Sequence, residues 1–330
     1  MARIDDIVAE DYQFVIPLVS PNWKVKTVEA QRYLKRRSSS VAFKVEEMGE
    51  MVLSRTNGVN TLGEIAMDLA QVYESDWRQV LLDIFDFFIA LISQGAIQLR
   101  DLQNIFQRRR ILDMTAPPEH IGLEHSNPFS HFDAIFCINV WANESRWADM
   151  QTRFARLGIA KSVIRYPAVE TPRTHHIGCT LSHRQLVALA RKWDAKNILV
   201  FEDDAEMLDT LLHELPPIVD TLEQREWKLF YLGGFPAHPI DRSLSDTTRL
   251  RTAKSMTCTH ALAYHNRSFE QILEEIPDNI AELSTWVKKY NAIDQYLTFK
   301  IDENYLATPT LSIQPVTRSF EDESMQNRYS

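Results

Sequence analysis

Three consecutive acids close a short apolar run near the middle of the chain. The run covers residues 198–201, and the acids are Glu202, Asp203 and Asp204. Such a run is typical of a buried strand, and ligands of open α/β sheets bind beyond the carboxyl ends of the strands. Clustered carboxylates repel one another unless a cation joins them, and oxygen ligands favour Mg²⁺ or Mn²⁺, which often arrive with substrate phosphates. The segment therefore predicts a divalent metal that holds a nucleotide diphosphate. A strand followed by a capped helix is the alternative.

The composition is that of a globular protein. The chain has 330 residues, of which 45% are apolar and 25% charged, enough for two domains of ordinary size. A net charge of −9 argues against a general nucleic-acid binder. It leaves a phosphate substrate open, because a metal can carry positive charge locally. The three cysteines Cys137, Cys179 and Cys258 have no paired spacing, which favours a reducing compartment.

The apolar segments are too short to span a bilayer, which needs about 20 apolar residues. The most apolar helical segment, residues 80–92, is interrupted by Asp83 and Asp86. Residues 1–6 lack the charged-then-apolar pattern of a secretory signal. We therefore expect no transmembrane segment and a cytoplasmic location.

The first hundred residues combine short strands with helices. Residues 24–28, 32–36 and 41–45 are β-like runs, and apolar residues then recur at helical spacing in 62–73 and 80–92. Thr61 and Glu64 have the spacing of a capping box, and Gly95 is placed to end the second helix. This pattern predicts a small α+β unit with a winged-helix-like outline over residues 1–105.

A polar connector over residues 106–131 follows this unit. It contains a run of three arginines at 108–110 and prolines at 117, 118 and 128, which favour a linker of limited flexibility. The arginine run is predicted to be a solvated face.

From residue 132 to 330 the pattern becomes α/β. Residues 134–138, 198–201 and 229–232 read as buried strands, and apolar residues from 147 to 157 form a helical stripe. Gly233 and Gly234 let the chain turn or let a ligand approach the backbone. Strands that alternate with helices predict a mainly parallel sheet covered on both faces.

Several motifs occur together in this second region. They are Asn139 with Arg146, GCTLSH at 178–183, EDDA at 202–205, WKLFYLGG at 227–234, HALAY at 260–264, Asp294, Pro309, Gln314 and Ser319. In this order they resemble glycosyltransferase family 25, the lipooligosaccharide and collagen-type galactosyltransferases, over about residues 132–320. Two positions depart from the family pattern. Lys228 stands where the family often has an acid, and Leu262 is an extra residue within the segment that resembles the family's HAYA stretch.

The resemblance implies a GT-A type, Rossmann-like nucleotide-sugar domain that performs an inverting transfer from a UDP-sugar with Mn²⁺ or Mg²⁺. Glu202 and Asp204 are spaced i, i+2, so on an extended segment they point the same way and form the expected metal pair. Asp204 is the stronger candidate of the two. His260 would complete the metal shell by analogy, and Asp203 would contact ribose or sugar hydroxyls.

A base must also reach the acceptor hydroxyl. Asp294 is the candidate, with a helix N-cap as the equally weighted alternative, and Glu321 or Asp322 are second choices.

Cys179 is expected to be a small buried residue of the core. His175 and His176 are expected to be surface residues in a loop.

The donor-binding residues implied by the resemblance surround the acids in the motif order. Ser182 and His183 are expected at the start of a helix, where phosphate is favoured, although a structural role for His183 stays open. The full set is Asn139, Arg146, Gly178, Ser182, His183, Asp203, Gly233 and Gly234.

The first region also resembles a known family. The segment TNGVNT at 56–61, Glu64 with Ile65, and the stretch from Val80 to Ile97 are similar to PqqD-like domains, the leader-peptide recognition elements of ribosomal peptide modification pathways. Such domains add an extended peptide to a sheet edge beside a helix. The resemblance implies an edge strand with Val41, Phe43 and Val45 and a facing helix with Ile84 and Phe88.

Three functions fit these observations. The first is an enzyme that glycosylates a ribosomally made precursor peptide whose leader is held by residues 1–105. The second is a transferase that acts on lipooligosaccharide or capsule saccharide, with the small unit as a docking module. The third, a DNA-binding winged-helix regulator, is disfavoured because residues 1–100 hold 11 Lys and Arg against 14 Asp and Glu. Basic residues cluster only at Arg32, Lys35, Arg36 and Arg37, which could instead hold an acidic leader.

Overall fold

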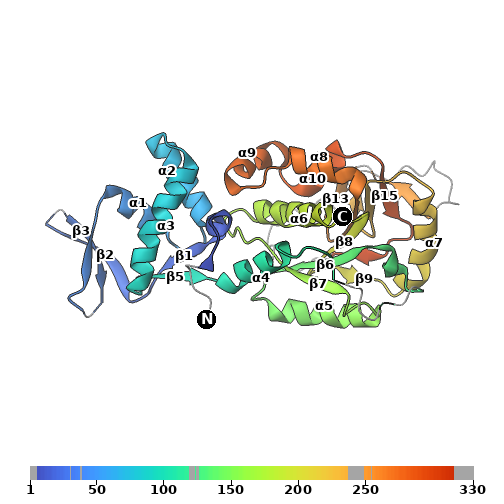
Figure 1. Cartoon of the computed structure of the whole chain (residues 1–330), viewed down its shortest axis with the longest axis horizontal. Coiled ribbons are helices and arrows are strands. Elements are labelled where there is room, and N and C mark those ends of the chain that lie inside the picture. The colour runs from blue at the N-terminus through green and yellow to red at the C-terminus, as the bar shows by residue number, and fades with distance from the viewer. Residues whose placement is uncertain are drawn as a thin grey trace, which may run out of the picture.

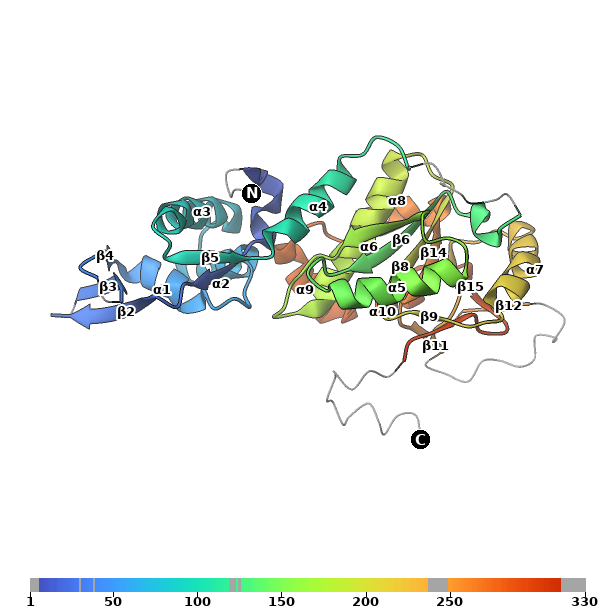
Figure 2. The same cartoon turned by 90° about the horizontal axis from the view of Figure 1, so that it is seen from below.

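The chain folds into a small N-terminal lobe and a larger C-terminal lobe (Figures 1 and 2). The structure is a computed structural model, and it describes residues 6–29, 31–37, 39–118, 123, 126–236, 249–253 and 255–315. The alternative bases Glu321 and Asp322, together with Ser319, lie outside the described residues.

The N-terminal lobe contains an antiparallel sheet in the order β2-β3-β4 and a second pair of strands, β1 with β5. Three helices pack beside them, and the predicted strands and helices at 24–45 and 62–92 are present. The elements are η2 (Ala9–Phe14), β1 (Ile16–Val19), β2 (Trp23–Val28), β3 (Gln31–Arg36), β4 (Ala42–Val45), α1 (Glu47–Arg55), α2 (Leu62–Tyr73), α3 (Trp77–Ser93) and β5 (Ile97–Arg100).

The helix ends in this lobe follow the local sequence signals. The Thr61 side chain accepts from the Glu64 amide and the Glu64 carboxylate accepts from the Thr61 amide, which completes the predicted capping box. Gly95 adopts a φ of +70° just after α3, a left-handed conformation that favours glycine and ends the helix.

The larger lobe is built on a seven-stranded mixed sheet in the order β12-β15-β10-β14-β8-β6-β7. Five strands run in one direction, whereas β14 and β12 run opposite to their neighbours, so the sheet is mostly parallel. The strands are β6 (Ala134–Asn139), β7 (Val163–Pro167), β8 (Asn197–Glu202), β10 (Leu229–Tyr231), β12 (Leu250–Thr252), β14 (Ala261–His265) and β15 (Asn304–Ala307).

Helices cover both faces of this sheet, as predicted for an α/β fold. Successive strand residues alternate between two apolar cores, for example Ile198 and Val200 on one face and Leu199 and Phe201 on the other. Figure 1 shows α6 and α8–α10 on one side and α5 on the other. The helices are α5 (Glu144–Arg156), α6 (His175–Lys192), α7 (Leu211–Glu223), α8 (Phe269–Glu275), α9 (Ile280–Tyr290) and α10 (Ile293–Lys300), and the short elements are η3 (Pro128–His131), β9 (Glu206–Met207), β11 (Phe235–Pro236), β13 (Met256–Thr257), η4 (Asn266–Ser268) and β16 (Ser312–Ile313).

The connection between the lobes is a helix, α4 (Leu102–Leu112), which packs on β7. The prediction that the arginine run at 108–110 is a solvated face is wrong for its first two members. Arg108 is 1% exposed, lies over the ring of Phe14 and donates to the Ala168 carbonyl (3.2 Å), and Arg109 pairs with the buried Asp11 (2.8 Å). Partners that are distant in sequence turn this stretch into part of the interface.

The two lobes share one continuous apolar core that extends from α2 and α3 to α6 and α9. Polar contacts cross the same interface: the Gln13 side chain accepts from the Ile280 amide (3.0 Å), and Asn104 donates to the Ala168 carbonyl (2.7 Å) and accepts from the Trp141 amide (3.1 Å). We therefore expect the lobes to unfold together.

The domain limits at 105 and 131 and the winged-helix outline stay predictions. In the part of the chain that the structure describes, no helix combines the length and apolar character needed to cross a bilayer.

Replacement of the buried interface residue Asn104 by alanine should destabilise the whole chain. Asn104→Ala removes one donor to the Ala168 carbonyl and the partner of the Trp141 amide, at a cost of about 1–3 kcal/mol. We expect one unfolding transition at a lower Tm by differential scanning calorimetry. The control is Gln31→Ala, at an exposed amide of β3. Equal Tm values for the two variants, or two separate transitions, would contradict the shared interface.

Candidate functional site

The three acids lie at the carboxyl end of β8, next to α6 and the loop before β14. The strand ends at Glu202, and Asp203 and Asp204 lie in a turn in which the Ala205 amide donates to the Glu202 carbonyl (3.0 Å). The extended segment on which Glu202 and Asp204 are predicted to pair therefore stops before Asp204. As a result, each of the three carboxylates has its own set of partners.

Asp203 is held by the end of β6 and by α5. Its carboxylate accepts from Asn139 Nδ2 (2.6 Å) and from the guanidinium of Arg146 (2.7 Å). Asn139 is 1% exposed, and its amide oxygen accepts from Arg165 Nε (2.9 Å), so Asn139 connects Arg165 to Asp203. Burial raises the pKa of Asp203 despite these contacts. Asn139 and Arg146 thus fix the Asp203 carboxylate at the turn, and the predicted contact of Asp203 with ribose or sugar hydroxyls and the predicted donor-binding role of Asn139 stay predictions.

Glu202 faces α6 and the loop before β14. One carboxylate oxygen accepts from Thr259 Oγ1 (2.5 Å) and lies 3.2 Å from His183 Nε2. The other ring nitrogen of His183 lies 2.9 Å from the Tyr264 hydroxyl, so this histidine is fully engaged and completely buried. Burial alone would raise the pKa of Glu202, but the hydrogen bonds from His183 and Thr259 bring it below its usual value.

His183 does not lie at a helix start. The helix α6 begins at His175, so His183 lies more than two turns inside it and its amide is not available to phosphate. His175 and His176 are consequently in the first turn of a helix and not in a loop as predicted.

Asp204 and His260 are the least satisfied polar groups of the site. Asp204 Oδ2 accepts from Gln314 Nε2 (2.8 Å) and lies 3.8 Å from Arg146, whereas Oδ1 is buried and has no hydrogen-bond partner among the described residues. His260 is completely buried, and neither ring nitrogen makes a well-formed hydrogen bond to a described residue, although the Ser312 carbonyl lies near the ring. Burial and repulsion from Glu202 raise the pKa of Asp204, and burial lowers that of His260.

A buried carboxylate oxygen and a neutral imidazole without partners fit a divalent cation. Carboxylate oxygen and imidazole nitrogen are both common ligands of Mn²⁺-type ions. The Asp204 side chain is 19% exposed, so this corner is reached from solvent. Buried polar atoms are normally hydrogen-bonded, and those left without a partner call for an explanation such as an ion or a ligand.

A second group of possible ligand atoms lies beside the first. The Cys179 sulfur, a ring nitrogen of His183 and a carboxylate oxygen of Glu202 all lie within 4.8 Å of one another. Here His183 and Glu202 already have hydrogen-bond partners, and burial raises the pKa of the Cys179 thiol well above its usual value, which disfavours the thiolate that a metal requires. We therefore assign this group to holding Glu202 in place.

Two of the predicted donor-binding residues are explained by packing. A Cβ on Gly178 would lie 2.2 Å from the Val169 carbonyl oxygen, and Ser182 Oγ accepts from the Val169 amide (2.9 Å). Both therefore hold α6 against the loop that follows β7.

Gly233 also allows a close approach. A Cβ there would lie 1.7 Å from the Ser312 carbonyl oxygen and 3.2 Å from His260 Nε2. Gly233 thus brings the segment of Ser312 and Gln314 against the corner that holds Asp204 and His260. A Cβ on Gly234, the next residue, would lie 2.6 Å from the methyl carbon of Met256.

Asp294 lies in the first turn of α10, close to the loop that carries Cys258 and Thr259. Its Oδ2 accepts from the Cys258 amide (3.0 Å) and its Oδ1 from the Gln295 amide (2.7 Å). The N-cap is Ala292, so the alternative reading of Asp294 as the cap is wrong. Burial, with repulsion from Glu202 and Asp294, raises the pKa of the Cys258 thiol to about 12.

The strand that was predicted as a peptide edge, β4, is present in the N-terminal lobe, and its contact with a peptide stays a prediction. Among the described residues, β4 pairs only with β3, so its other side is an open edge. Val41 is 39% exposed beside it, Phe43 is half-buried against Trp23, and Val45 is buried. Ile84 and Phe88 are 2% and 0% exposed in the core of the lobe, so their predicted contact with a peptide is not supported.

Four residues of the site were not predicted as site residues. Arg165, Thr259, Tyr264 and Gln314 contact the site residues only through the fold, each across a separation of 26 or more positions. Tyr264 and Gln314 are among the residues that resemble the family motifs, but the resemblance assigned them no role, whereas Arg165 and Thr259 belong to none of those motifs.

The comparisons with known proteins bear on the larger lobe. Residues 173–279 match the family described as glycosyltransferase family 25 (LPS biosynthesis protein). No curated protein matches the chain. The matched residues contain His183, the acids at 202–204, Gly233 and His260, and the match supports a glycosyltransferase activity for this lobe.

Three solved structures have partial similarity. A mannose-1-phosphate geranyltransferase from Thermus thermophilus is 12% identical, with 53% of this chain and 72% of that chain covered and a TM-score of 0.31. The heterocyclase TruD is 12% identical (91% and 41% covered, TM-score 0.20), and a heterocyclase in complex with substrate and cofactor is 15% identical (92% and 39% covered, TM-score 0.21). The chain spans about two fifths of the length of these heterocyclases, and TM-scores of this size do not define a shared fold.

Loss of the Thr259 hydroxyl should destabilise the site from within. Thr259→Val keeps the shape but removes a donor to the half-buried Glu202 carboxylate, at a cost of about 1–3 kcal/mol. The matched control is Thr257→Val, which removes a hydrogen bond from an exposed hydroxyl to the Phe235 carbonyl. We expect a lower Tm by thermal unfolding for Thr259→Val only. An equal Tm for both variants would show that the Glu202 contact is unimportant.

Proposed function

We propose that this chain is a metal-dependent, inverting glycosyltransferase that moves a sugar from a UDP-sugar to a ribosomally made precursor peptide. The observation that carries the proposal is the buried Asp204 Oδ1, which has no hydrogen-bond partner among the described residues, together with the buried ring of His260, near which the Ser312 carbonyl lies. This corner lies within the stretch that matches glycosyltransferase family 25. It stands at the carboxyl end of β8, where ligands of α/β sheets bind.

Asp204 and His260 would hold the cation, Mn²⁺ or Mg²⁺. When bound, such an ion neutralises negative charge on the diphosphate of a nucleotide. Glu202, the other predicted ligand, is occupied by Thr259 and His183, and we propose that it positions the loop that carries His260, whose carbonyl accepts from the Glu202 amide (2.9 Å).

The chain supplies one further positive charge for a nucleotide donor. The guanidinium of Arg146 is 38% exposed and lies between Asp203 (2.7 Å) and Asp204 (3.8 Å). Asp203 fixes its direction, and its remaining donors are open to a phosphate, for which arginine has a suitable planar geometry.

Asp294 is the candidate base for the acceptor hydroxyl. Each of its oxygens accepts a hydrogen bond from a backbone amide, which fixes its orientation and leaves further lone pairs on this half-buried carboxylate. A positioned carboxylate with free lone pairs fits a general base. Its amide contact with Cys258 joins it to the loop that continues to His260.

The N-terminal lobe would hold the peptide. The open edge of β4 offers unpaired backbone groups to an extended segment, and the interface with the larger lobe keeps a bound peptide near the transfer site. Attachment of this kind raises the effective concentration of the acceptor.

A second candidate is transfer to a lipooligosaccharide or capsule saccharide, with the N-terminal lobe as a docking module. It is favoured by the description of the matched family as an LPS biosynthesis protein. A difference in turnover between peptide and saccharide acceptors would separate the two candidates.

Replacement of Asp204 should remove metal-dependent nucleotide binding. Asp204→Asn lacks the anionic ligand, so we expect the affinity for UDP in the presence of Mn²⁺ to fall on the order of 100-fold by isothermal titration calorimetry. The Tm in the absence of metal should remain close to that of the wild type. Asp209→Asn, at an exposed acid of the following loop, is the control and should bind as the wild type does. Unchanged affinity in Asp204→Asn would remove this residue from the metal site.

Replacement of Asp294 should separate donor binding from turnover. Asp294→Asn keeps an oxygen for the Cys258 amide but cannot take a proton, so UDP release from a panel of UDP-sugars should fall by about 100-fold or more. The affinity for UDP with Mn²⁺ should not change, and Asp209→Asn again serves as the control. Wild-type turnover in Asp294→Asn would require a different base.

A further inference from the structure

The outer face of the β2-β3-β4 sheet is lined with lysines. The strand register places Lys24 directly opposite Lys35, and the neighbouring row contains Lys26, Tyr33 and Lys44. Side chains two residues apart along a strand share a face, so the four lysines lie on one surface. The other face packs inward, with Trp23 and Leu34 buried in the lobe.

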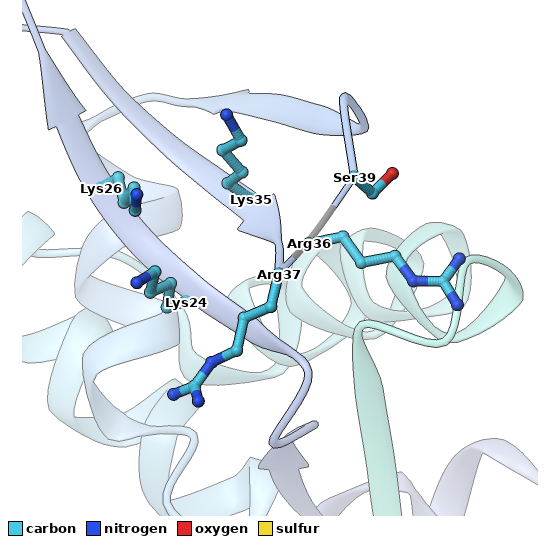
Figure 3. Close-up of a pocket in the computed structure, with 6 residues that line it drawn as sticks. All are labelled: Lys24, Lys26, Lys35, Arg36, Arg37 and Ser39. Atoms are coloured by element: carbon cyan, nitrogen blue, oxygen red, sulfur yellow. The ribbon is translucent and has the colours of Figure 1, made fainter.

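Arg37 extends this surface where β3 ends, and Arg36, which the register places on the face of Trp23 and Leu34, lines the rim of the same hollow. Lys24, Lys26, Lys35, Arg36, Arg37 and Ser39 line an open concavity of about 410 Å³ (Figure 3). Figure 3 shows the cations arising from two adjacent strands and from the turn that follows β3. Arg32 does not belong to this surface, because it pairs with Glu50 of α1.

The cations of this face lack partners of opposite charge within the described part of the chain. None of the four lysines, nor Arg36 or Arg37, makes an ion pair with a residue that the structure describes. Like charges directly opposite one another in a sheet are destabilising, and Lys24 and Lys35 are such a pair. A bound anionic group would relieve this repulsion.

The positive charge is local, which argues against long polyanions. Residues 1–100 carry a net charge of −3, and acids such as Asp83 and Asp86 are exposed on α3. A nucleic acid or a membrane surface extends beyond a patch of six cations and would meet these acids, whereas a short acidic segment would not. The concavity and its serine hydroxyl also suit individual carboxylates better than a flat surface does.

We propose that this basic face binds an acidic segment of the peptide substrate, next to the segment that adds to β4. The inference rests on the proposed function, and it assigns a charge preference to the peptide and a second contact surface to the lobe. The strand β4 contains only four residues, so a longer peptide continues past it. Beyond the β3–β4 turn the peptide reaches Arg36 and Arg37, and aspartate or glutamate side chains there pair with the cations.

The test uses the full chain and fluorescein-labelled oligo-glutamate, with oligo-glutamine of equal length as the neutral probe. The variant is Lys24→Glu/Lys26→Glu/Lys35→Glu, and the control is Lys161→Glu/Lys288→Glu/Lys300→Glu, which changes the net charge equally at exposed lysines of the larger lobe. We expect the wild type and the control to bind oligo-glutamate, with an affinity that falls at high salt. Neither should bind oligo-glutamine. Loss of several exposed ion pairs should weaken binding to the variant about tenfold.

A neutral variant, Lys24→Gln/Lys26→Gln/Lys35→Gln, keeps the test decisive if the reversed charges impair folding. It should also bind oligo-glutamate more weakly, with a Tm no lower than that of the wild type. Equal oligo-glutamate binding by the wild type and both variants would overturn the inference. The inference would also be overturned if the wild type bound single-stranded DNA or phosphatidylserine vesicles more tightly than oligo-glutamate and the lysine substitutions weakened that binding.

A titration with UDP and Mn²⁺ separates this inference from the proposed function. Both lysine variants should bind them as the wild type does, because the basic face lies in the other lobe. If oligo-glutamate binding fails while UDP and Mn²⁺ still bind, the acidic-segment inference is wrong and the transferase remains. If the wild type does not bind UDP with Mn²⁺, the proposed function fails whatever the peptide result.

Discussion

The arrangement of the site depends on how three adjacent carboxylates are kept at the end of one buried strand. Charged groups near a protein interior need partners or an ion. The Asp203 carboxylate is hydrogen-bonded by Asn139 and Arg146. The Glu202 carboxylate is hydrogen-bonded by Thr259 and His183. Asp204 has Gln314 on one oxygen only, and its other oxygen, like the ring of His260, lacks a partner among the described residues. The proposed cation site rests on this difference in hydrogen bonding among the three acids.

The rest of the fold serves this corner and connects it to the N-terminal lobe. Because Gly233 has no side chain, the backbone at Ser312 can pack against it, and Gln314 then lies beside Asp204. Asp294 accepts a hydrogen bond from the loop that leads to His260. The apolar core and the buried contacts of α4 continue from this lobe into the smaller one. A peptide held at β4 and at the lysine face would therefore be attached to the same folded unit as the proposed transfer site.

Local signals predicted the elements with strong periodicity, whereas contacts distant in sequence decided the rest. The helix at 62–73 and its capping box follow directly from Thr61, Glu64 and the apolar spacing. The start of α6 was missed because its N-cap, Thr174, makes no side-chain cap hydrogen bond and nothing local marks it. Ile84 and Phe88 were placed at a surface because the apolar face of α3 does not reveal what covers it. The acids at 202–204 were found from sequence, but the turn at Asp203 and the partners Thr259 and Gln314 depend on the tertiary fold.

The central claim is that Asp204 and His260 bind a divalent cation together with a nucleotide diphosphate. The most direct measurement is anomalous diffraction from crystals of the full chain soaked with Mn²⁺ and UDP. The account predicts a manganese peak within bonding distance of both an Asp204 carboxylate oxygen and a His260 ring nitrogen, with diphosphate density beside it. A peak among Cys179, His183 and Glu202, or an Asp204 carboxylate without a bound ion, would contradict it.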